Sequence, residues 1–180
     1  MKNEAPAMVT LYSDSLMLRT VHGGDAGEVA RMWEWLEGPI SLEKAGEAIA
    51  NMEVNHRLNK PGHIHHLCLA VFEKGSDRII GWCGLDGKWT PGKVVLFYSI
   101  DTEYQRRGYA TQCALRLFEY AFESVGLEIV HSGCFKDNTA SFRVMEKAGM
   151  ILLGQDEESG DPQFYIDKMT YEQNKKGFPA

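Results

Sequence analysis

Six consecutive residues, Gln-Arg-Arg-Gly-Tyr-Ala at 105–110, combine two adjacent arginines with a glycine at the point where a helical pattern begins. The first amides of a helix have no acceptor within the helix, and the helix dipole adds about half a positive charge there. Phosphate oxygens can bind both features. Gly108 lets the backbone approach a ligand closely, Ala110 keeps the helix start thin, and Arg106 and Arg107 can add charge-assisted hydrogen bonds. The stretch therefore predicts a site for a phosphorylated ligand.

The flanking residues place this loop between a strand and a helix. Residues 94–100, Val-Val-Leu-Phe-Tyr-Ser-Ile, have the composition of a buried strand. Beyond Gly108 the apolar residues recur at helical spacing, as Ala110, Cys113, Ala114, Leu117, Phe118, Ala121, Phe122 and Val125. One glycine is too few for a dinucleotide-binding loop, and residues 81–88 lack the glycine spacing of a P-loop. The pattern favours an anion site over either nucleotide-binding motif.

The rest of the chain alternates short strands with amphipathic helices. Helices are predicted at 25–36, where Asp25 can form the cap, at 41–58, where Ser41 can do so, and at 108–125 and 138–147. Strands are predicted at 16–19, 67–72, 79–85, 94–100, 129–135, 150–153 and 163–168. Short turns separate the strands between residues 67 and 100, which indicates an antiparallel meander. Neither a repeat nor a linker interrupts the chain, so residues 1–180 are expected to form one domain, with a core at about 14–170.

Two blocks of residues resemble the signatures of one family. Gln105, Gly108 and Ala110 occupy the defining positions of the motif Q/R-x-x-G-x-G/A. Residues 138–150, Asn-Thr-Ala-Ser-Phe-Arg-Val-Met-Glu-Lys-Ala-Gly-Met, resemble a second signature, N-x-x-S followed by E-K-x-G-F. Both signatures belong to the GNAT acetyltransferase superfamily, and Leu-Met-Leu-Arg at 16–19 is similar to its RimJ/RimL-like branch, which acetylates protein N-termini and, in relatives, small amines. The resemblance covers nearly the whole chain, from Leu16 to Lys168.

The resemblance implies an α/β (α+β) fold made of a single GNAT-type domain. Its mixed, mostly antiparallel central sheet would have about six to seven strands flanked by about four helices. The sheet would be splayed between the fourth and fifth strands, which are the predicted strands at 94–100 and 129–135.

The resemblance also implies acetyl-CoA as cosubstrate and no metal. Main-chain groups near Ile100 would pair with the pantetheine amides, and the amides from Arg106 to Thr111 would hold the pyrophosphate. Asn138 would bind the pantetheine arm and Ser141 would lie near the cofactor sulfur. The expected cofactor-binding residues are Ile100, Gln105, Arg106, Arg107, Gly108, Tyr109, Ala110, Thr111, Asn138 and Ser141.

The expected catalytic residues are Ser141 and Tyr98. Many family members carry a tyrosine four residues after the serine, where it protonates the departing thiolate, but this chain has Met145 there. The acid role therefore falls to Ser141, to water or to no group. Tyr98 could order a water that deprotonates the acceptor amine, or it could be a core tyrosine with a satisfied hydroxyl, and the sequence supports the two interpretations equally.

Composition excludes several other classes of protein. A net charge of -6 argues against binding a nucleic acid backbone, and no apolar stretch is long enough to cross a membrane. The cysteines are dispersed in apolar runs, which is typical of reduced, buried thiols in the cytoplasm: Cys68, Cys83, Cys113 and Cys134. His63, His65 and His66 lie close together, but neighbours on a strand face opposite sides, so a surface or substrate-rim role is favoured over a metal site.

The sequence thus predicts an N-acetyltransferase that moves the acetyl group of acetyl-CoA to a primary amine by direct attack in a ternary complex. The acceptor would be a protein N-terminal α-amine or a small-molecule amine, and the acidic balance of the chain suits a cationic one. The alternative is a non-catalytic CoA-binding or interaction domain of the same fold. For Trp33 and Trp35, core packing is favoured over a position at the mouth of the acceptor site. Whether the chain forms a homodimer is left open.

Overall fold

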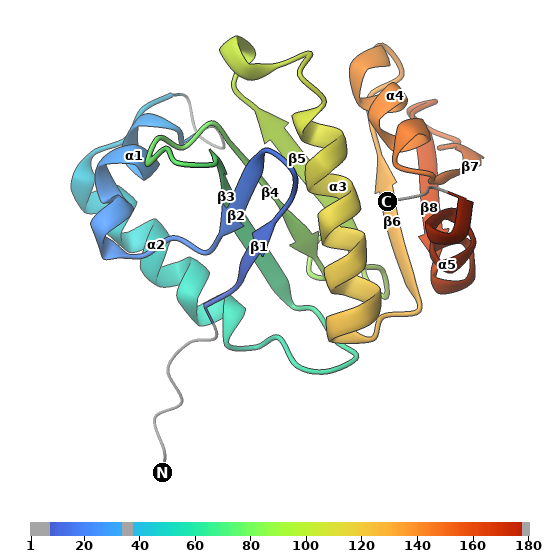
Figure 1. Ribbon diagram of the computed structural model, residues 1–180, viewed down its shortest axis with the longest axis horizontal. Coiled ribbons are helices and arrows are strands. Elements are labelled where there is room, and N and C mark those ends of the chain that lie inside the picture. Colours follow the sequence, from blue (N-terminus) through green and yellow to red (C-terminus); the bar gives the residue numbers. More distant parts are fainter. Residues whose placement is uncertain (1–7, 34–37, 178–180) are drawn as a thin grey trace.

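The computed structural model describes residues 8–33 and 38–177. They build one eight-stranded sheet with helices on both faces (Figure 1). The strands are β1 (Thr10–Tyr12), β2 (Leu16–Arg19), β3 (His66–Glu73), β4 (Gly81–Asp86), β5 (Val95–Ile100), β6 (Ile129–Gly133), β7 (Ile151–Gln155) and β8 (Pro162–Asp167). The helices are α1 (Ala26–Arg31), α2 (Leu42–His56), α3 (Tyr109–Glu119), α4 (Thr139–Lys147) and α5 (Lys168–Gly177).

The strands follow the order β1-β2-β3-β4-β5-β6-β8-β7 across the sheet. Neighbours run antiparallel except β5 and β6, which are parallel. Whereas β4 and β5 pair along their whole lengths, β5 and β6 pair at Val95 and His131 alone among the described residues. The two halves of the sheet are therefore joined by a short contact at the start of β5.

Alternating side chains on the strands divide the core into two layers. On one face Cys68, Ala70 and Phe72 of β3 pack with α1 and α2, and on the other Leu67, Leu69 and Val71 pack against α3. Met145 of α4 and Phe164 of β8 extend this second layer. In Figure 1, α1 and α2 stand at one side of the view, α3 at its centre, and α4 and α5 beside β7 and β8 at the other. Helix α3 thus lies over β2, β4 and β5.

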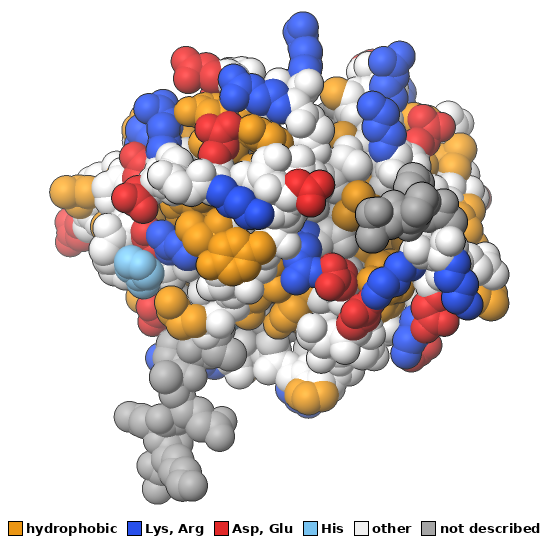
Figure 2. All heavy atoms as spheres, in the orientation of Figure 1, with side chains coloured by type: hydrophobic (Ala, Val, Ile, Leu, Met, Phe, Trp, Pro, Cys, Tyr) orange, Lys and Arg blue, Asp and Glu red, His pale blue; other side chains and the backbone are white. Residues whose placement is uncertain are grey.

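Charges of both signs are mixed on the face of the molecule that Figure 2 shows. In the orientation of Figure 1, Lys and Arg side chains are interspersed with Asp and Glu, and this face shows no continuous basic area (Figure 2). None of the described helices is long and apolar enough to span a membrane.

The seven predicted strands and four predicted helices are confirmed, with four differences. Strand β1 and helix α5 were not predicted, and they lie at the edges of the core expected at about 14–170 or beyond it. Helix α1 ends at Arg31 and not near Leu36, which lies outside the described residues. The predicted helix at 108–125 is α-helical to Glu119 and continues as a π-helical turn, η3 (Tyr120–Val125).

The two predicted caps have different outcomes. Ser41 caps α2, because its hydroxyl accepts from the Lys44 amide at 3.2 Å. The Asp25 prediction is wrong, since its carboxylate makes no cap bond to α1. It pairs with Arg19 at 2.7 Å instead, because a guanidinium on the neighbouring strand is a stronger partner than a helix amide.

Candidate active site

The basic loop connects β5 to α3 through a single 3₁₀ turn, η2 (Thr102–Tyr104). Asp101 caps this turn, accepting from the Glu103 amide at 3.1 Å. The Gln105 side chain then bends back and donates to the Ile100 carbonyl at 2.8 Å. Gly108 ends the loop with φ 78°, a left-handed conformation that glycine adopts without strain.

The start of α3 presents free amides. Gly108 is the N-cap and has no side chain, and none of the described side chains caps the helix. The first bond within the helix runs from the Gln112 amide to the Gly108 carbonyl at 3.0 Å, so the amides of Tyr109, Ala110 and Thr111 precede the ladder. A Cβ at Gly108 would meet nothing within 4 Å, so the space in front of the loop is open. These features fit a pyrophosphate.

Two side chains of the loop anchor it to the sheet. Arg107 contacts the Glu73 carboxylate at 3.4 Å and donates to the Glu103 carbonyl at 3.2 Å. The Tyr109 hydroxyl also donates to Glu73, at 2.5 Å. The exposed Arg106, with φ 62°, has no hydrogen-bond partner among the residues that the structure places. Of the two arginines, Arg106 is therefore the one left for a ligand.

The edge of β5 that faces β6 is only partly used. The Val94 carbonyl accepts from the His131 amide at 2.8 Å, and the Leu96 carbonyl accepts from the Ser132 hydroxyl at 3.1 Å. Alternate residues face the same neighbour, so the main-chain groups of Tyr98 and Ile100 also point toward β6. Beyond Val95 no described strand pairs with this edge.

The structure brings the two expected catalytic residues together. The Tyr98 hydroxyl donates to the main-chain carbonyl of Ser141 at 3.1 Å, which links β5 to the first turn of α4. Burial raises the pKa of Tyr98 to about 12, although the Ser141 side chain opposes the shift, so the Tyr98 hydroxyl stays protonated at neutral pH. Asn138 caps α4, because its side-chain oxygen accepts from the Ser141 amide at 3.0 Å. Met145, one turn later, is 0% exposed in the core and presents nothing to a ligand.

A cavity of about 550 Å³ lies between the end of α1 and the end of β5. It is lined by Arg31, Met32, Trp33, Gly38, Pro39, Ser99, Ile100, Asp101, Thr102 and Gln105. Trp33 thus lines this cavity, while Trp35 lies outside the described residues. Arg31 and Asp101 were not predicted from the sequence, because each lies at an ordinary helix end or strand end with no motif around it.

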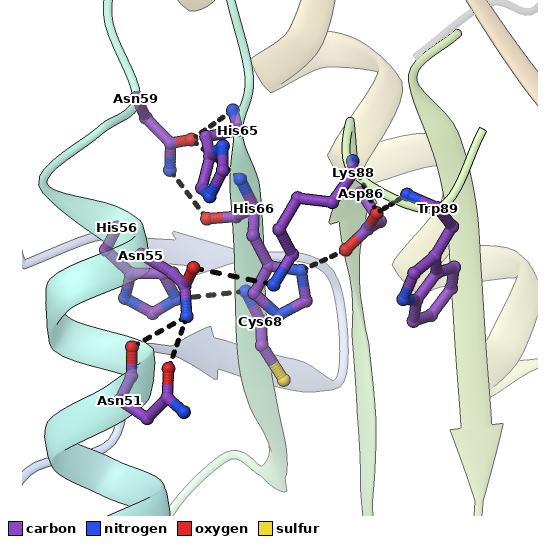
Figure 3. A network of polar contacts seen from close by, with 10 residues as sticks. All are labelled: Asn51, Asn55, His56, Asn59, His65, His66, Cys68, Asp86, Lys88 and Trp89. Atoms are coloured by element: carbon purple, nitrogen blue, oxygen red, sulfur yellow. Dashed lines mark hydrogen bonds and ion pairs between the residues drawn. The ribbon is translucent and has the colours of Figure 1, made fainter. Parts of the chain in front are cut away.

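The histidines form a structural cluster at the opposite end of the sheet (Figure 3). His66 bonds the fully buried Asp86, whose other oxygen accepts from the Lys88 and Trp89 amides at 2.7 Å each. His56 accepts from the Cys68 amide at 3.0 Å, and burial lowers its pKa to about 4. In the described part of the chain no three potential ligands converge on a metal position. His66 therefore ties β3 to β4 and does not stand at the surface.

Comparison with known proteins gives the class of this chain. The model of the acetyltransferase (GNAT) domain family matches residues 15–151. The chain therefore belongs to the GNAT acetyltransferase family, in its RimJ/RimL-like branch, and is an acetyl-CoA-dependent N-acetyltransferase.

Individual relatives are distant in sequence. An uncharacterized N-acetyltransferase, p20 of Bacillus licheniformis, is 23% identical over 155 residues, covering 80% of this chain and 86% of that protein. The structure of RimL, a ribosomal L7/L12 α-N-protein acetyltransferase, superposes with a TM-score of 0.68 at 16% identity over 93% of this chain and 98% of that one. The microcin C7 self-immunity acetyltransferase MccE, solved with acetyl-CoA and AMP, also has a TM-score of 0.68, at 15% identity over 86% and 93% of the two chains. At these identities the structural matches show a shared fold.

Proposed function

We propose that this chain transfers the acetyl group of acetyl-CoA to a primary amine by direct attack within a ternary complex. The observation that carries the proposal is the uncapped start of α3 beside the unpaired edge of β5. A cavity on the other side of the same strand offers the acceptor its place. Both substrates could therefore meet across β5.

The residues divide the binding of acetyl-CoA among three elements. The pyrophosphate binds the first amides of α3 and the free guanidinium of Arg106, where the helix dipole favours negative charge. The pantetheine amides pair with the main-chain groups of Tyr98 and with the Ile100 amide as a strand would, since the Ile100 carbonyl already accepts from Gln105. Asn138 has its oxygen engaged in the cap, so its amino group is the part that can donate to the pantetheine arm.

Acetyl transfer from a thioester to a neutral amine needs little acid or base catalysis from side chains. The amine nitrogen bonds to the acetyl carbon, the carbon–sulfur bond breaks, and the nitrogen gives its extra proton to water. A thiol has an ordinary pKa of about 8.5, so the departing thiolate needs only modest help, which the Ser141 hydroxyl or water supplies. A main-chain amide of β5 can stabilise the negative charge that develops on the acetyl oxygen.

The absence of a strong base in the sequence motifs favours an acceptor that loses its proton readily. An α-amine has a pKa of about 7.7–8.0, compared with about 10.4 for a lysine side chain. A protein N-terminus or a small amine of similar basicity is therefore the preferred acceptor. Tyr98 stays protonated and bonded to Ser141, so it serves as a donor that fixes the start of α4 better than as a base.

A non-catalytic CoA-binding domain of the same fold is the second candidate, because the buried Met145 replaces the acid common in the family. A thiol-release assay separates the two functions. The purified protein is incubated with acetyl-CoA and a panel of primary amines, and free thiol is followed over time. The proposal expects release that depends on both enzyme and amine, whereas a binding domain would retain acetyl-CoA with release at the background rate.

A further inference from the structure

Arg31 presents one fixed, unused edge to the cavity. Its Nε and Nη2 donate to the two oxygens of Glu28 at 3.2 and 2.8 Å, and Nη2 also donates to the Ile79 carbonyl at 2.6 Å. These bonds hold the guanidinium plane in place on α1 and the turn before β4. The remaining nitrogen, Nη1, has no acceptor among residues 8–33 and 38–177, and Arg31 lines the cavity. A rigid two-proton donor is therefore available to a ligand.

Asp101 offers the complementary group from the end of β5. One of its oxygens caps the Glu103 amide at 3.1 Å, and its own amide donates to the Ile80 carbonyl at 2.9 Å, so the residue is fixed. The second oxygen has no donor in the described chain. Asp101 is close enough to raise the pKa of Arg31 as a secondary cause, after the hydrogen bond to Glu28, yet the two are not paired at ion-pair distance. Both residues line the same cavity.

The local charge selects the kind of ligand that can bridge the two groups. Arg31 and Asp101 are the charged residues among those that line the cavity, and Glu28 pairs with Arg31 from outside the lining. Asp101 is therefore left to attract a cationic or neutral amine. Because Glu28 already neutralises Arg31, the Nη1 edge suits a neutral carbonyl oxygen better than a second carboxylate. An amine that carries a carboxamide or peptide carbonyl on the adjacent carbon offers an N–H for Asp101 and an oxygen for Arg31. A polyamine has no oxygen for Arg31, and a free amino acid brings a negative charge toward Asp101.

We propose that Asp101 and Arg31 are the specificity-determining residues of the acceptor site, with the Asp101 carboxylate binding the acceptor N–H and Arg31 Nη1 binding the neighbouring carbonyl oxygen. The inference rests on the proposed acetyl transfer and assigns its acceptor class as α-amino amides. Ser99 and Ile100 line the same cavity, so an amine held by Asp101 lies against β5, where the thioester is expected.

The test compares two amines of the same shape. Alaninamide has the carbonyl oxygen, and its hydrocarbon analogue carries an isopropyl group in place of the carboxamide. Each is measured with the wild type and with Arg31→Lys, which keeps a charge for Glu28 but has no Nη1 edge. Since the intrinsic reactivity of each amine cancels between variants, the ratio of kcat/KM for the two amines reports the Arg31 contact alone. Arg31→Lys should lower this ratio about 10- to 100-fold, the range expected for a lost hydrogen bond to a charged group.

A second pair of variants tests the carboxylate. Asp101→Asn keeps an oxygen to cap the Glu103 amide but loses the charge. This variant should lower kcat/KM for both amines by about 10-fold or more. Glu103→Gln is the control, because it removes the same charge two residues away from an exposed side chain outside the cavity lining. Glu103→Gln should leave kcat/KM for both amines unchanged. The inference would be overturned if the ratio of kcat/KM for the two amines were the same in the wild type and Arg31→Lys. It would also be overturned if Asp101→Asn and Glu103→Gln lowered kcat/KM by the same factor.

Calorimetry keeps this result separate from the proposed function. Alaninamide is titrated into protein saturated with CoA, a complex that binds without turning over. If no amine releases thiol but alaninamide binds with the same dependence on Arg31 and Asp101, acetyl transfer fails and the binding site stands. If thiol is released but the affinity for alaninamide and the kcat/KM ratio are unchanged in the Arg31 and Asp101 variants, the assigned acceptor site is wrong and the proposed acetyl transfer is still supported.

Discussion

Gly108 offers the sharpest test of the acetyl-CoA site, because its replacement should separate binding from folding. With φ 78° the backbone is left-handed there, which costs an L-residue about 1–2 kcal/mol. A Cβ at this position would meet nothing within 4 Å, so Gly108→Val adds strain but no clash. We expect the free energy of unfolding to fall by about 1–2 kcal/mol, which a domain with a stability of about 5–15 kcal/mol tolerates.

The effect of Gly108→Val on acetyl-CoA should be much larger. The valine side chain occupies the open space where the phosphates are expected, and relief of the strain turns the first amides of α3 away. Loss of two hydrogen bonds to a charged group, at about 1.5–3 kcal/mol each, corresponds to about 10²–10⁴-fold weaker binding. Isothermal titration calorimetry measures the affinity and urea unfolding measures the stability.

Gly126→Val is the matched control, because it carries the same strain at a distant position. Gly126 has φ 80°, has nothing within 4 Å of an added Cβ, and ends η3 beyond the other end of α3. It should lose similar stability and keep its affinity for acetyl-CoA. A folded Gly108→Val protein with unchanged affinity, or a Gly126→Val protein with the same loss of affinity, would refute the reasoning.

Three further predictions concern the acid and the pH dependence of stability. Ser141→Ala should lower kcat by about 100-fold or less, with acetyl-CoA affinity little changed, and an unaltered kcat when chemistry limits turnover would show that water protonates the thiolate. Met145→Tyr should destabilise the protein by about 1–3 kcal/mol, because the ring enters a core where Met145 is 0% exposed, and a gain in kcat would contradict this placement. His56, with a folded pKa of about 4, binds its proton in the unfolded chain first, so its contribution is present at pH 7 and lost as pH falls. From His56 alone, the free energy of unfolding measured in urea should be about 2 kcal/mol lower at pH 5 than at pH 7. In His56→Gln the free energy of unfolding should fall by that much less between the two pH values.

The parts of the fold that the sequence predicted are those with strong local patterns. The apolar spacing beyond Gly108 indicated α3. The short turns that separate successive strands indicated the meander from β3 to β5. Strand β1 was missed because it has three residues and is held by pairing with β2, with Leu11 opposite Leu18. Helix α5 is too polar to show a periodic face, and its Tyr171 and Lys175 depend on contacts with Glu123 far away in the chain. Such contacts leave no local signal.

The candidate site was predictable where one loop carried it and not where it assembles from separate elements. The phosphate loop and the start of α4 could be recognised because their residues are consecutive. The approach of Arg31 and Asp101 depends on α1 ending beside β5, and the burial of Asp86 depends on its register opposite His66. Spacing along the chain cannot predict either, because strand register and helix docking bring these residues together.

In the proposed function the chain itself catalyses acetyl transfer from bound acetyl-CoA to an amine without a covalent enzyme intermediate. A single-turnover reaction with enzyme in excess over acetyl-CoA tests this most directly, with mass spectrometry of the amine, the CoA and the intact protein at successive times. We expect one acetylated amine for each CoA released, formed only when the amine is present, and an unmodified protein throughout. Acetyl-CoA that remains bound and intact in the presence of every amine, or an acetyl group on the protein before the amine is added, would contradict it.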